Sequence, residues 1–387
     1  MKEGWEYKKL GEIAEIKGGK RLPKGVKLLT TPTKHPYIRV ADFNDRGTIE
    51  TNDIHYISDS VYEQIKRYII KKEDVYISIA GTIGKSGVIP VFLDGANLTE
   101  NACRLILSNN LYQRFVYYYT ISPSFIKQIV ERTKKSAQPK LALTRLSDVI
   151  ISYPPLSEQQ SIVDYLDSAF AKIDAMKANA GKALNEAKAL FQASLKEMLE
   201  PKEGWEEKTL KELCKVINGR AYSKDEMLKK GKYRLLRVGN FFTNDSWYYS
   251  DLELEDDKYC DNGDLLYAWS ASFGPRIWDG EKVIYHYHIW KMVCSAEIDK
   301  FFLCYWLDSD ELKKQTMTNL HGATMAHITK GIIEAARVGF PPLSEQQSIV
   351  ETLDSLKSKV DRLQENYDKI SQECDALKQA ILRQVFE

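Results

Sequence analysis

The sequence predicts an α+β fold in which two similar α/β domains alternate with two long helices that form an antiparallel intramolecular coiled coil. Residues 154–163 recur without a change at residues 341–350, so the chain contains two copies of one plan. Each copy is followed by apolar residues spaced alternately by three and four positions, the pattern of a coiled-coil seam. The sequence Glu-Gly-Trp-Glu at residues 3–6 returns at residues 203–206, so a similar domain precedes each helix.

These repeats set the expected boundaries. We expect a first domain over residues 1–153, a central helical spacer over 154–200, a second domain over 201–340 and a C-terminal helical spacer over 341–387. Within the central spacer, the helix itself is expected from about residue 158 to residue 199.

Each helix has a start signal in the sequence. Two prolines at residues 154–155 keep the chain extended, and Ser157 then predicts an N-cap that forms a capping box with Gln160. Ser344 and Gln347 repeat the arrangement before the second helix.

The expected seam of the coiled coil consists of the apolar residues at this alternating spacing. They are Ile162, Leu166, Ile173 and Met176 in the first helix, and Ile349, Leu353, Leu356, Val360, Leu363, Ile370, Leu377 and Ile381 in the second. Later in the first helix the apolar positions drift toward Leu184, Phe191, Leu195 and Met198. Two amphipathic helices packed on separate cores are the alternative, but roughly 40 residues exceeds the usual length of a globular helix.

The first domain has mixed elements. Strands are expected at residues 37–40, 75–79, 88–92 and 103–107, the second of them half-buried, and a helical pattern over 114–130 is interrupted at Ser122-Pro123.

The second domain repeats this frame with different loops. Residues 235–238 correspond to 37–40, and 264–267 correspond to 74–77, whereas the segments between these matches differ strongly. A repeated scaffold with divergent loops suits a binding protein that recognises two different targets with one frame.

Composition limits the class of protein. The net charge of +1 neither supports nor excludes nucleic acid, because a local basic patch can supply the field. Six scattered cysteines without a Cys-x-x-Cys pair indicate reduced thiols in a cytoplasm and no zinc site. No apolar run is long enough to span a bilayer and no leader is recognisable, so we expect no membrane association.

Several sequences resemble catalytic motifs but lack required residues. The glycine-rich stretch 81–86 has Ile79 where a P-loop needs its first glycine, so a DNA-facing basic loop and a plain turn remain open. Tyr153-Pro154-Pro155-Leu156 lacks the acid and the final aromatic residue of an adenine-methylase motif. His286 and His288 share one strand face, where they suit a hydrogen-bonded pair, a DNA contact or, third, a metal site.

The arrangement of domain, Pro-Pro-Leu-Ser-Glu-Gln-Gln helix, domain and second such helix resembles the specificity (S) subunit of type I restriction-modification systems. The Gly-Trp openings at Trp5 and Trp205 and the two proline-led stretches carry this resemblance over the whole chain. It implies two target recognition domains that each recognise one half of a bipartite, asymmetric site on double-stranded DNA. It also implies that the coiled coil sets the gap and docks two methyltransferase (M) subunits.

The same resemblance implies a non-catalytic chain without its own cofactor. The M subunits would use S-adenosylmethionine, and the restriction (R) subunits, reached through the complex, would use ATP and Mg.

Candidate DNA contacts are residues that can bind phosphate or read base edges. They are Lys20, Arg21, Arg39, Lys85, Arg104, Lys134, Lys135 and Gln138 in the first domain, and Arg220, Arg237, Ser270, Ser272, Arg276, His286, Lys291, His321 and His327 in the second. Arg39 and Arg237 occupy matching places, so they could instead serve the frame. A coiled-coil scaffold that joins two protein-binding domains is the second hypothesis, and an enzyme is the third.

Overall fold

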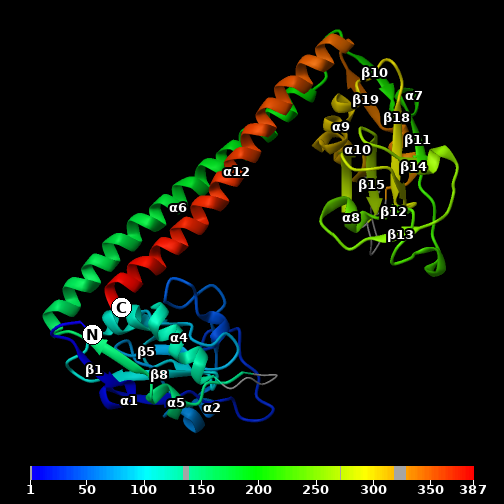
Figure 1. Cartoon of the computed structure of the whole chain (residues 1–387). Coiled ribbons are helices and arrows are strands. Elements are labelled where there is room, and N and C mark those ends of the chain that lie inside the picture. The colour runs from blue at the N-terminus through cyan, green and yellow to red at the C-terminus, as the bar shows by residue number, and fades with distance from the viewer. Residues whose placement is uncertain (1, 134–138, 271, 318–327) are drawn as a thin grey trace. The chain divides into compact units, whose positions relative to one another are not determined.

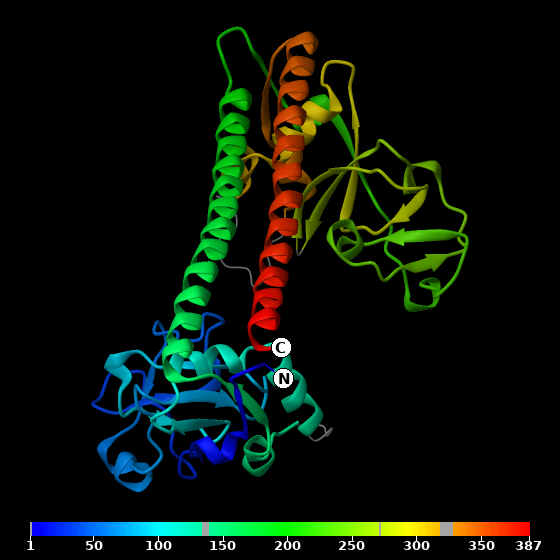
Figure 2. The ribbon, with the colours of Figure 1, turned by 60° about the vertical axis from the view of Figure 1, so that its left-hand side comes forward.

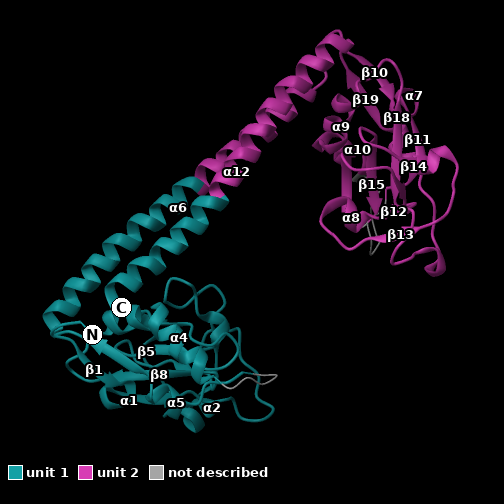
Figure 3. Ribbon diagram, viewed as in Figure 1, with its two compact units in different colours: residues 1–180, 368–387 teal, residues 181–367 magenta. Residues whose placement is uncertain are grey.

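The computed structural model describes residues 2–133, 139–270, 272–317 and 328–387 (Figure 1). It divides into two compact units, unit 1 with residues 1–180 and 368–387, and unit 2 with residues 181–367 (Figure 3). Each unit contains one mixed domain and part of both long helices, α6 (Leu156–Leu199) and α12 (Leu343–Phe386).

Within each unit, α6 and α12 lie side by side and run in opposite directions (Figures 1 and 2). In unit 1, Lys378 donates to Asp174 over 2.5 Å and Lys177 donates to Asp375 over 3.3 Å. In unit 2, Lys188 donates to Gln364 over 2.7 Å. The predicted fold class, two similar domains with an antiparallel intramolecular coiled coil, is therefore confirmed.

Unit 1 contains two small sheets and a strand pair next to the long helix. The first sheet has the order β2 (Ala14–Gly18), β8 (Ala102–Leu107), β5 (Val75–Ser78), β6 (Ser86–Val88), and the second has the order β4 (His55–Tyr56), β3 (Pro36–Ile38), β7 (Asn97–Leu98). β1 (Glu6–Lys9) pairs antiparallel with β9 (Ile150–Tyr153), which leads into α6. The helices of the domain are α1 (Leu10–Ile13), α2 (Asp59–Ile65), α3 (Gln113–Thr120), α4 (Pro123–Arg132) and α5 (Leu143–Ser147).

Unit 2 repeats this architecture. Its first sheet has the order β11 (Cys214–Asn218), β18 (Ile289–Cys294), β15 (Leu265–Ser270), β16 (Ser272–Ile277), and its second has the order β13 (Tyr248–Ser250), β12 (Tyr233–Leu236), β17 (Val283–Tyr285), β14 (Tyr259–Cys260). β10 (Glu206–Thr209) pairs with β19 (Arg337–Phe340), which leads into α12. The helices are α7 (Leu210–Leu213), α8 (Val238–Phe242), α9 (Lys300–Asp308), α10 (Asp310–Met317) and α11 (Lys330–Ala335).

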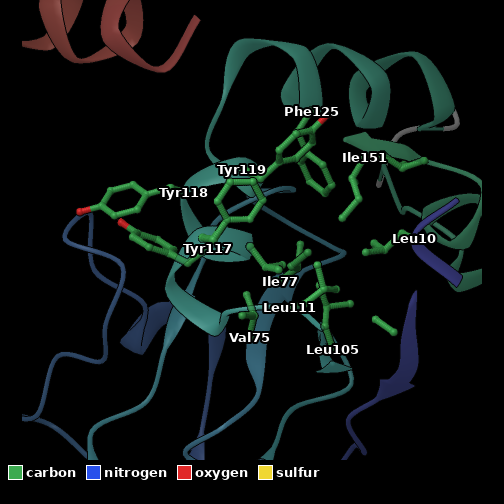
Figure 4. Close-up of a cluster of buried hydrophobic side chains, with 14 of the residues drawn as sticks. Leu10, Val75, Ile77, Leu105, Leu111, Tyr117, Tyr118, Tyr119, Phe125 and Ile151 are labelled. Carbon is green, nitrogen blue, oxygen red and sulfur yellow. The ribbon is translucent and has the colours of Figure 1, made fainter. Parts of the chain in front are cut away.

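The central strand β5 is buried on both faces, not half-buried as its alternating pattern predicted. Val75 and Ile77 point into the main core of unit 1, which α3 and α4 cover (Figure 4). Tyr76 points the other way into a second core, where its ring stacks on Phe43 at 4.0 Å between centroids. A polar-looking alternation that includes tyrosine can thus belong to a strand between two cores.

The strand expected over residues 88–92 ends earlier. β6 stops at Val88, and a 3-10 turn over Val91–Leu93 follows Pro90. Proline fixes its own φ and has no N–H for the ladder, which explains the stop. Val91 and Phe92 are consequently exposed.

The predicted capping boxes are wrong. α6 begins at Leu156, so Ser157 lies inside the first turn, and Ser344 lies at the same place in α12. In α6 the carbonyl of Pro155 accepts the first backbone bonds, from the N–H groups of Glu158 and Gln159.

A buried glutamine joins each long helix to its domain. The Gln159 amide oxygen accepts from the backbone N–H of Tyr112 at 2.8 Å, and its nitrogen donates to the carbonyls of Asn110 and Pro154 at 2.9 and 2.8 Å. Gln346 makes the same three bonds in unit 2, to Asp299, Glu297 and Pro341. Both side chains are fully buried, so three backbone groups in each unit depend on one amide for a hydrogen-bond partner.

The two repeated sequence markers contact each other. The Trp5 indole donates to the Glu158 carboxylate at 3.2 Å, and Trp205 donates to Glu345 at 3.3 Å. The opening of each domain is thereby bound to the first turn of the helix that closes the same domain.

Three of the twelve predicted seam positions are displaced by one residue. Leu166, Ile173 and Leu353 are buried, but Met176, Leu363 and Leu377 are 59%, 37% and 48% exposed. The half-buried positions that replace them are Lys177, Gln364 and Lys378, whose aliphatic stems cover the seam while their polar ends reach outward. Of the other predicted positions, Ile349 is buried, and Ile162, Leu356, Val360, Ile370 and Ile381 are half-buried.

No described helix is both long enough and apolar enough to cross a membrane.

We expect Gln159→Ala to lower the free energy of unfolding of unit 1 by about 2–4 kcal/mol, because it leaves buried backbone groups without partners. The neighbouring Gln160→Ala is the matched control, since Gln160 is exposed and bonds only to Asp164. It should change stability by less than about 0.5 kcal/mol. Thermal unfolding of the two variants tests this, and equal midpoints would contradict the role of Gln159.

Candidate nucleic-acid interface

Three turns meet where the two sheets of unit 1 join. The first follows β2 at residues 19–21, the second follows β5 at residues 79–85, and the third links β7 to β8 at residues 99–101. The N–H of Gly19 donates to Ala102 and that of Lys20 donates to Leu98, while Ile79 donates to Asn101. We call these residues the unit 1 turn cluster.

Unit 2 builds the same cluster from residues 219–221, 269–273 and 286–288. The N–H of Gly219 donates to Ile289, that of Arg220 donates to Tyr285, and that of Trp269 donates to His288. The two clusters therefore share one backbone arrangement, although their sequences differ. Of its 269–273 turn, the structure describes every residue except 271.

The glycines of both clusters are required by packing. A Cβ atom at Gly19 would lie 2.1 Å from the Thr99 carbonyl oxygen, and one at Gly219 would lie 2.4 Å from that of His286. Their close approach explains the repeated glycine before Lys20 and Arg220 without a bound phosphate.

Side chains of the unit 1 cluster are charged. Arg21 donates from Nε to Glu100 at 2.6 Å, and the other Glu100 oxygen accepts from the Thr99 hydroxyl at 3.0 Å. Burial opposes ionisation of Glu100, but its bonds to Arg21, the backbone and Thr99 hold its pKa below the usual value. Lys20 lies 5.4 Å from the centroid of the Tyr68 ring.

Apart from Arg220, the prominent side chains of the unit 2 cluster are aromatic. The rings of His286, Tyr287 and His288 are neighbours, at 4.4 and 4.0 Å between successive centroids, and the Trp269 indole donates to the Tyr287 carbonyl. Burial, His288 and Arg237 lower the pKa of His286 to about 4. His286 is therefore neutral at pH 7 in the free chain.

Most of the nominated basic residues that the structure describes form ion pairs inside their own domain. Arg39 pairs with Asp42, and Arg220 pairs with Glu226. Arg104 pairs with Asp74 at 2.8 Å, with side chains only 11% and 5% exposed, and Lys291 pairs with Asp264 at 2.6 Å. In each unit, the cation of β8 or β18 holds the aspartate that directly precedes β5 or β15. These two pairs therefore occupy equivalent places, which indicates a role in the frame.

The other nominated residues are distributed unevenly. Lys85 pairs with Asp45, Arg237 lies over Tyr248, and Arg276 is bonded to the Phe241 carbonyl and Asp279. Ser270 is buried and Ser272 is exposed. Lys134, Lys135, Gln138, His321 and His327 lie outside the described residues.

An open pocket of about 440 Å³ lies beside the unit 1 cluster. Gly18, Gly19, Arg67, Tyr68 and Arg104 are among the residues that line it. Arg67 is exposed at its rim, so the pocket presents positive charge next to the turn cluster.

The glycine-rich stretch after β5 is a turn of a β-hairpin. β6 follows it directly, so no helix N-terminus is available there to bind a phosphate, which excludes the P-loop. In the described part of the chain, no three His, Cys, Asp or Glu side chains are grouped as metal ligands.

Glu100 and Tyr287 occupy matching places in the two clusters, and sequence reasoning nominated neither. Leu98 and Tyr285 are equivalent, because each lies in a strand that pairs parallel with an equivalent strand, β3 or β12. Glu100 and Tyr287 each lie two residues further along the chain, so they are equivalent as well. The signal was thus present in the repeat, but the neighbouring sequences differ too much to reveal it.

We expect Arg104→Ala to cost about 3–5 kcal/mol of stability, because it leaves the buried Asp74 carboxylate without its cation.

Lys20→Ala, at an exposed position, should change stability by less than about 0.5 kcal/mol. If Lys20 contacts phosphate, the same variant should lower the salt dependence of duplex binding by about one unit of slope. Thermal unfolding and salt titrations measure both effects, and a stable Arg104→Ala that loses only DNA binding would reverse the assignment.

Comparison with known proteins adds the family. The model of the family described as Type I restriction modification DNA specificity domain matches the chain twice, at residues 2–185 and 202–372. The MjaVIII type I restriction enzyme specificity subunit of Methanocaldococcus jannaschii is 24% identical over 93% of this chain and 87% of its own length. The EcoBI specificity subunit of Escherichia coli is 28% identical over 41% of this chain, which corresponds to 33% of its own length.

Solved structures are similar in fold. A chain from work on complex assembly and conformational transition of the type I R-M system has a TM-score of 0.82 at 19% identity, covering 100% of this chain and 98% of its own. The HsdS subunit from Thermoanaerobacter tengcongensis has a TM-score of 0.60 at 19% identity, with 100% and 97% covered. Because the family model matches most of both halves, the chain belongs to the type I restriction-modification DNA specificity family and carries two copies of its domain.

Proposed function

We propose that this chain is the DNA-sequence-recognition subunit of a type I restriction-modification complex. Each domain recognises one half of a bipartite, asymmetric site on double-stranded DNA, and the coiled coil sets the gap between the halves. The observation that carries this proposal is one backbone frame built twice, with charged side chains at one turn cluster and aromatic side chains at the other. Identical frames with different surfaces suit two independent readers of different bases.

Chemistry on DNA is assigned to partner subunits. Methyl transfer from S-adenosylmethionine belongs to M subunits, and ATP- and Mg-dependent steps belong to R subunits. The chain itself is non-catalytic in this proposal. A cytoplasmic location suits its six free cysteines, of which burial raises the pKa of Cys103 and Cys214 to about 12.

Exchange of residues 205–340 for the same segment of a relative should change one half of the target and leave the other half unchanged. The reason is that β10 to β19 form a domain with its own core. Methylated sites mapped in the assembled complex provide the measurement. A simultaneous change in both halves would show that the domains are not independent, and binding without sequence preference would favour a scaffold role.

Exposed apolar residues on the helices supply a docking surface for M subunits. Met176 and Leu377 are at the same level of the antiparallel pair in unit 1, next to the contacts of Lys177 with Asp375 and Asp174 with Lys378. Leu190 and Leu363 form the corresponding pair in unit 2, near the Lys188 contact with Gln364.

These four exposed residues widen the apolar stripe of each long helix beyond what the seam between two helices requires. A helix that packs on more than one neighbour carries apolar residues at about three of every seven positions, as these helices do. The stripe therefore fits helices of a partner protein, and its occurrence in both units fits two M subunits.

We expect the double variant Met176→Lys and Leu377→Lys to weaken assembly with M subunits by at least about 100-fold, because the two apolar side chains together contribute about 3–6 kcal/mol when buried. The double variant Ala175→Lys and Ala376→Lys is the control, since it adds the same charge at exposed positions next to Met176 and Leu377. Sedimentation or titration of the purified subunits measures the effect. Equal assembly of all variants would exclude this surface.

A further inference from the structure

The two turn clusters differ most at one pair of matching positions. Unit 1 has Arg21 and Glu100 where unit 2 has Ala221 and Tyr287. The backbone around them is held by the same hydrogen bonds in both units, so the difference concerns side-chain chemistry alone. The glycine and the backbone hydrogen bonds are the same in both units here. Unit 2 has an alanine and a tyrosine at the two positions where unit 1 has the charged pair.

Arg21 and Glu100 form a pair that remains open to a ligand. The Arg21 side chain is 78% exposed, and only its Nε is bonded, to one oxygen of Glu100. No described residue accepts from its two terminal nitrogens. The Glu100 carboxylate accepts from the Arg21 and Thr99 side chains and from the backbone, and one of its about four acceptor sites stays open, so donors and acceptors stand side by side.

This arrangement is complementary to one kind of base pair. In the major groove, guanine presents the acceptors O6 and N7, and the cytosine paired with it presents the N4 donor. Arginine is the side chain that binds guanine by two bonds, and a carboxylate is the one that accepts from cytosine N4. An adenine–thymine pair would instead place the thymine O4 acceptor or the thymine methyl group near the Glu100 carboxylate.

We propose that Arg21 and Glu100 together read one G·C base pair in the half-site that unit 1 recognises. This inference rests on the proposed function, because it assigns a base-reading role within a DNA-recognition domain. The bond between the two side chains fixes their planes before DNA binds, which lowers the entropy lost on binding. Unit 2 has neither charge at this place, so it reads its half-site by other contacts, and the two halves of the site differ.

The ionised state of Glu100 agrees with this role. Its bonds to Arg21, the backbone and Thr99 outweigh the effect of burial and lower its pKa, so the carboxylate is an acceptor at pH 7. A protonated or amide side chain at the same place would present a donor as well.

The test selects duplexes from a random-sequence pool with the whole chain assembled with its M subunits. We compare wild type with Glu100→Gln and Arg21→Lys. Glu100→Gln keeps the shape and a hydrogen bond to Arg21 but offers an amide, which pairs with adenine. Arg21→Lys keeps the positive charge but loses the planar fork. Both variants should lose about 10–100-fold discrimination at the same single base-pair position of one half-site.

Glu63→Gln is the matched control, because Glu63 and Lys66 also form an exposed ion pair in unit 1, on α2. It should leave the selected site unchanged. The proposal is overturned if Glu100→Gln leaves the preferred sequence intact, or if Arg21→Lys and Glu100→Gln weaken all sequences equally. Wild-type protein that selects no sequence would overturn the proposed function as well, so the two failures are distinguishable.

Discussion

The buried amide of Gln159, repeated by Gln346, fixes each domain to its long helix. Without it, the carbonyl of Asn110 and the N–H of Tyr112 would be buried with no partner, at about 1–3 kcal/mol for each group. The bond from Trp5 to Glu158 joins the start of the domain to the same helical turn. The direction in which α6 leaves its domain is therefore set by these polar contacts together with Val163 and Leu166, which lie in the core of unit 1. In unit 2, Val350 and Leu353 of α12 lie in the core in the same way.

Divergence between the units is confined to places where it costs little stability. Gly19 and Gly219 cannot change, because a Cβ atom would collide with backbone. Arg104 and Lys291 keep a cation beside an equivalent carboxylate, although the residue type differs. The turn side chains of Glu100 and Tyr287 are only partly buried, so substitution there alters recognition with little effect on folding.

The repeat made the architecture predictable, and broad apolar patterns limited the detail. Ten identical residues located both helices, but leucines at 363 and 377 suggested a seam one residue from the true one, because Gln364 and Lys378 look like surface residues. The site was less predictable. Arg104 looked available for DNA because its partner Asp74 lies on another segment, and only packing brings the two together.

Near the middle of the helix pair, Tyr367 of α12 packs on Gly181 of α6, where an added Cβ would lie 3.2 Å from the tyrosine ring. In the repeat, Ala180 of α6 corresponds to Tyr367, and Asp368 of α12 corresponds to Gly181. Two α6 helices would leave a void at this level, and two α12 helices would force each tyrosine against an aspartate. The duplicated halves have thus become unlike partners, so hetero-pairing is favoured over self-pairing even though both helices begin with the same ten residues.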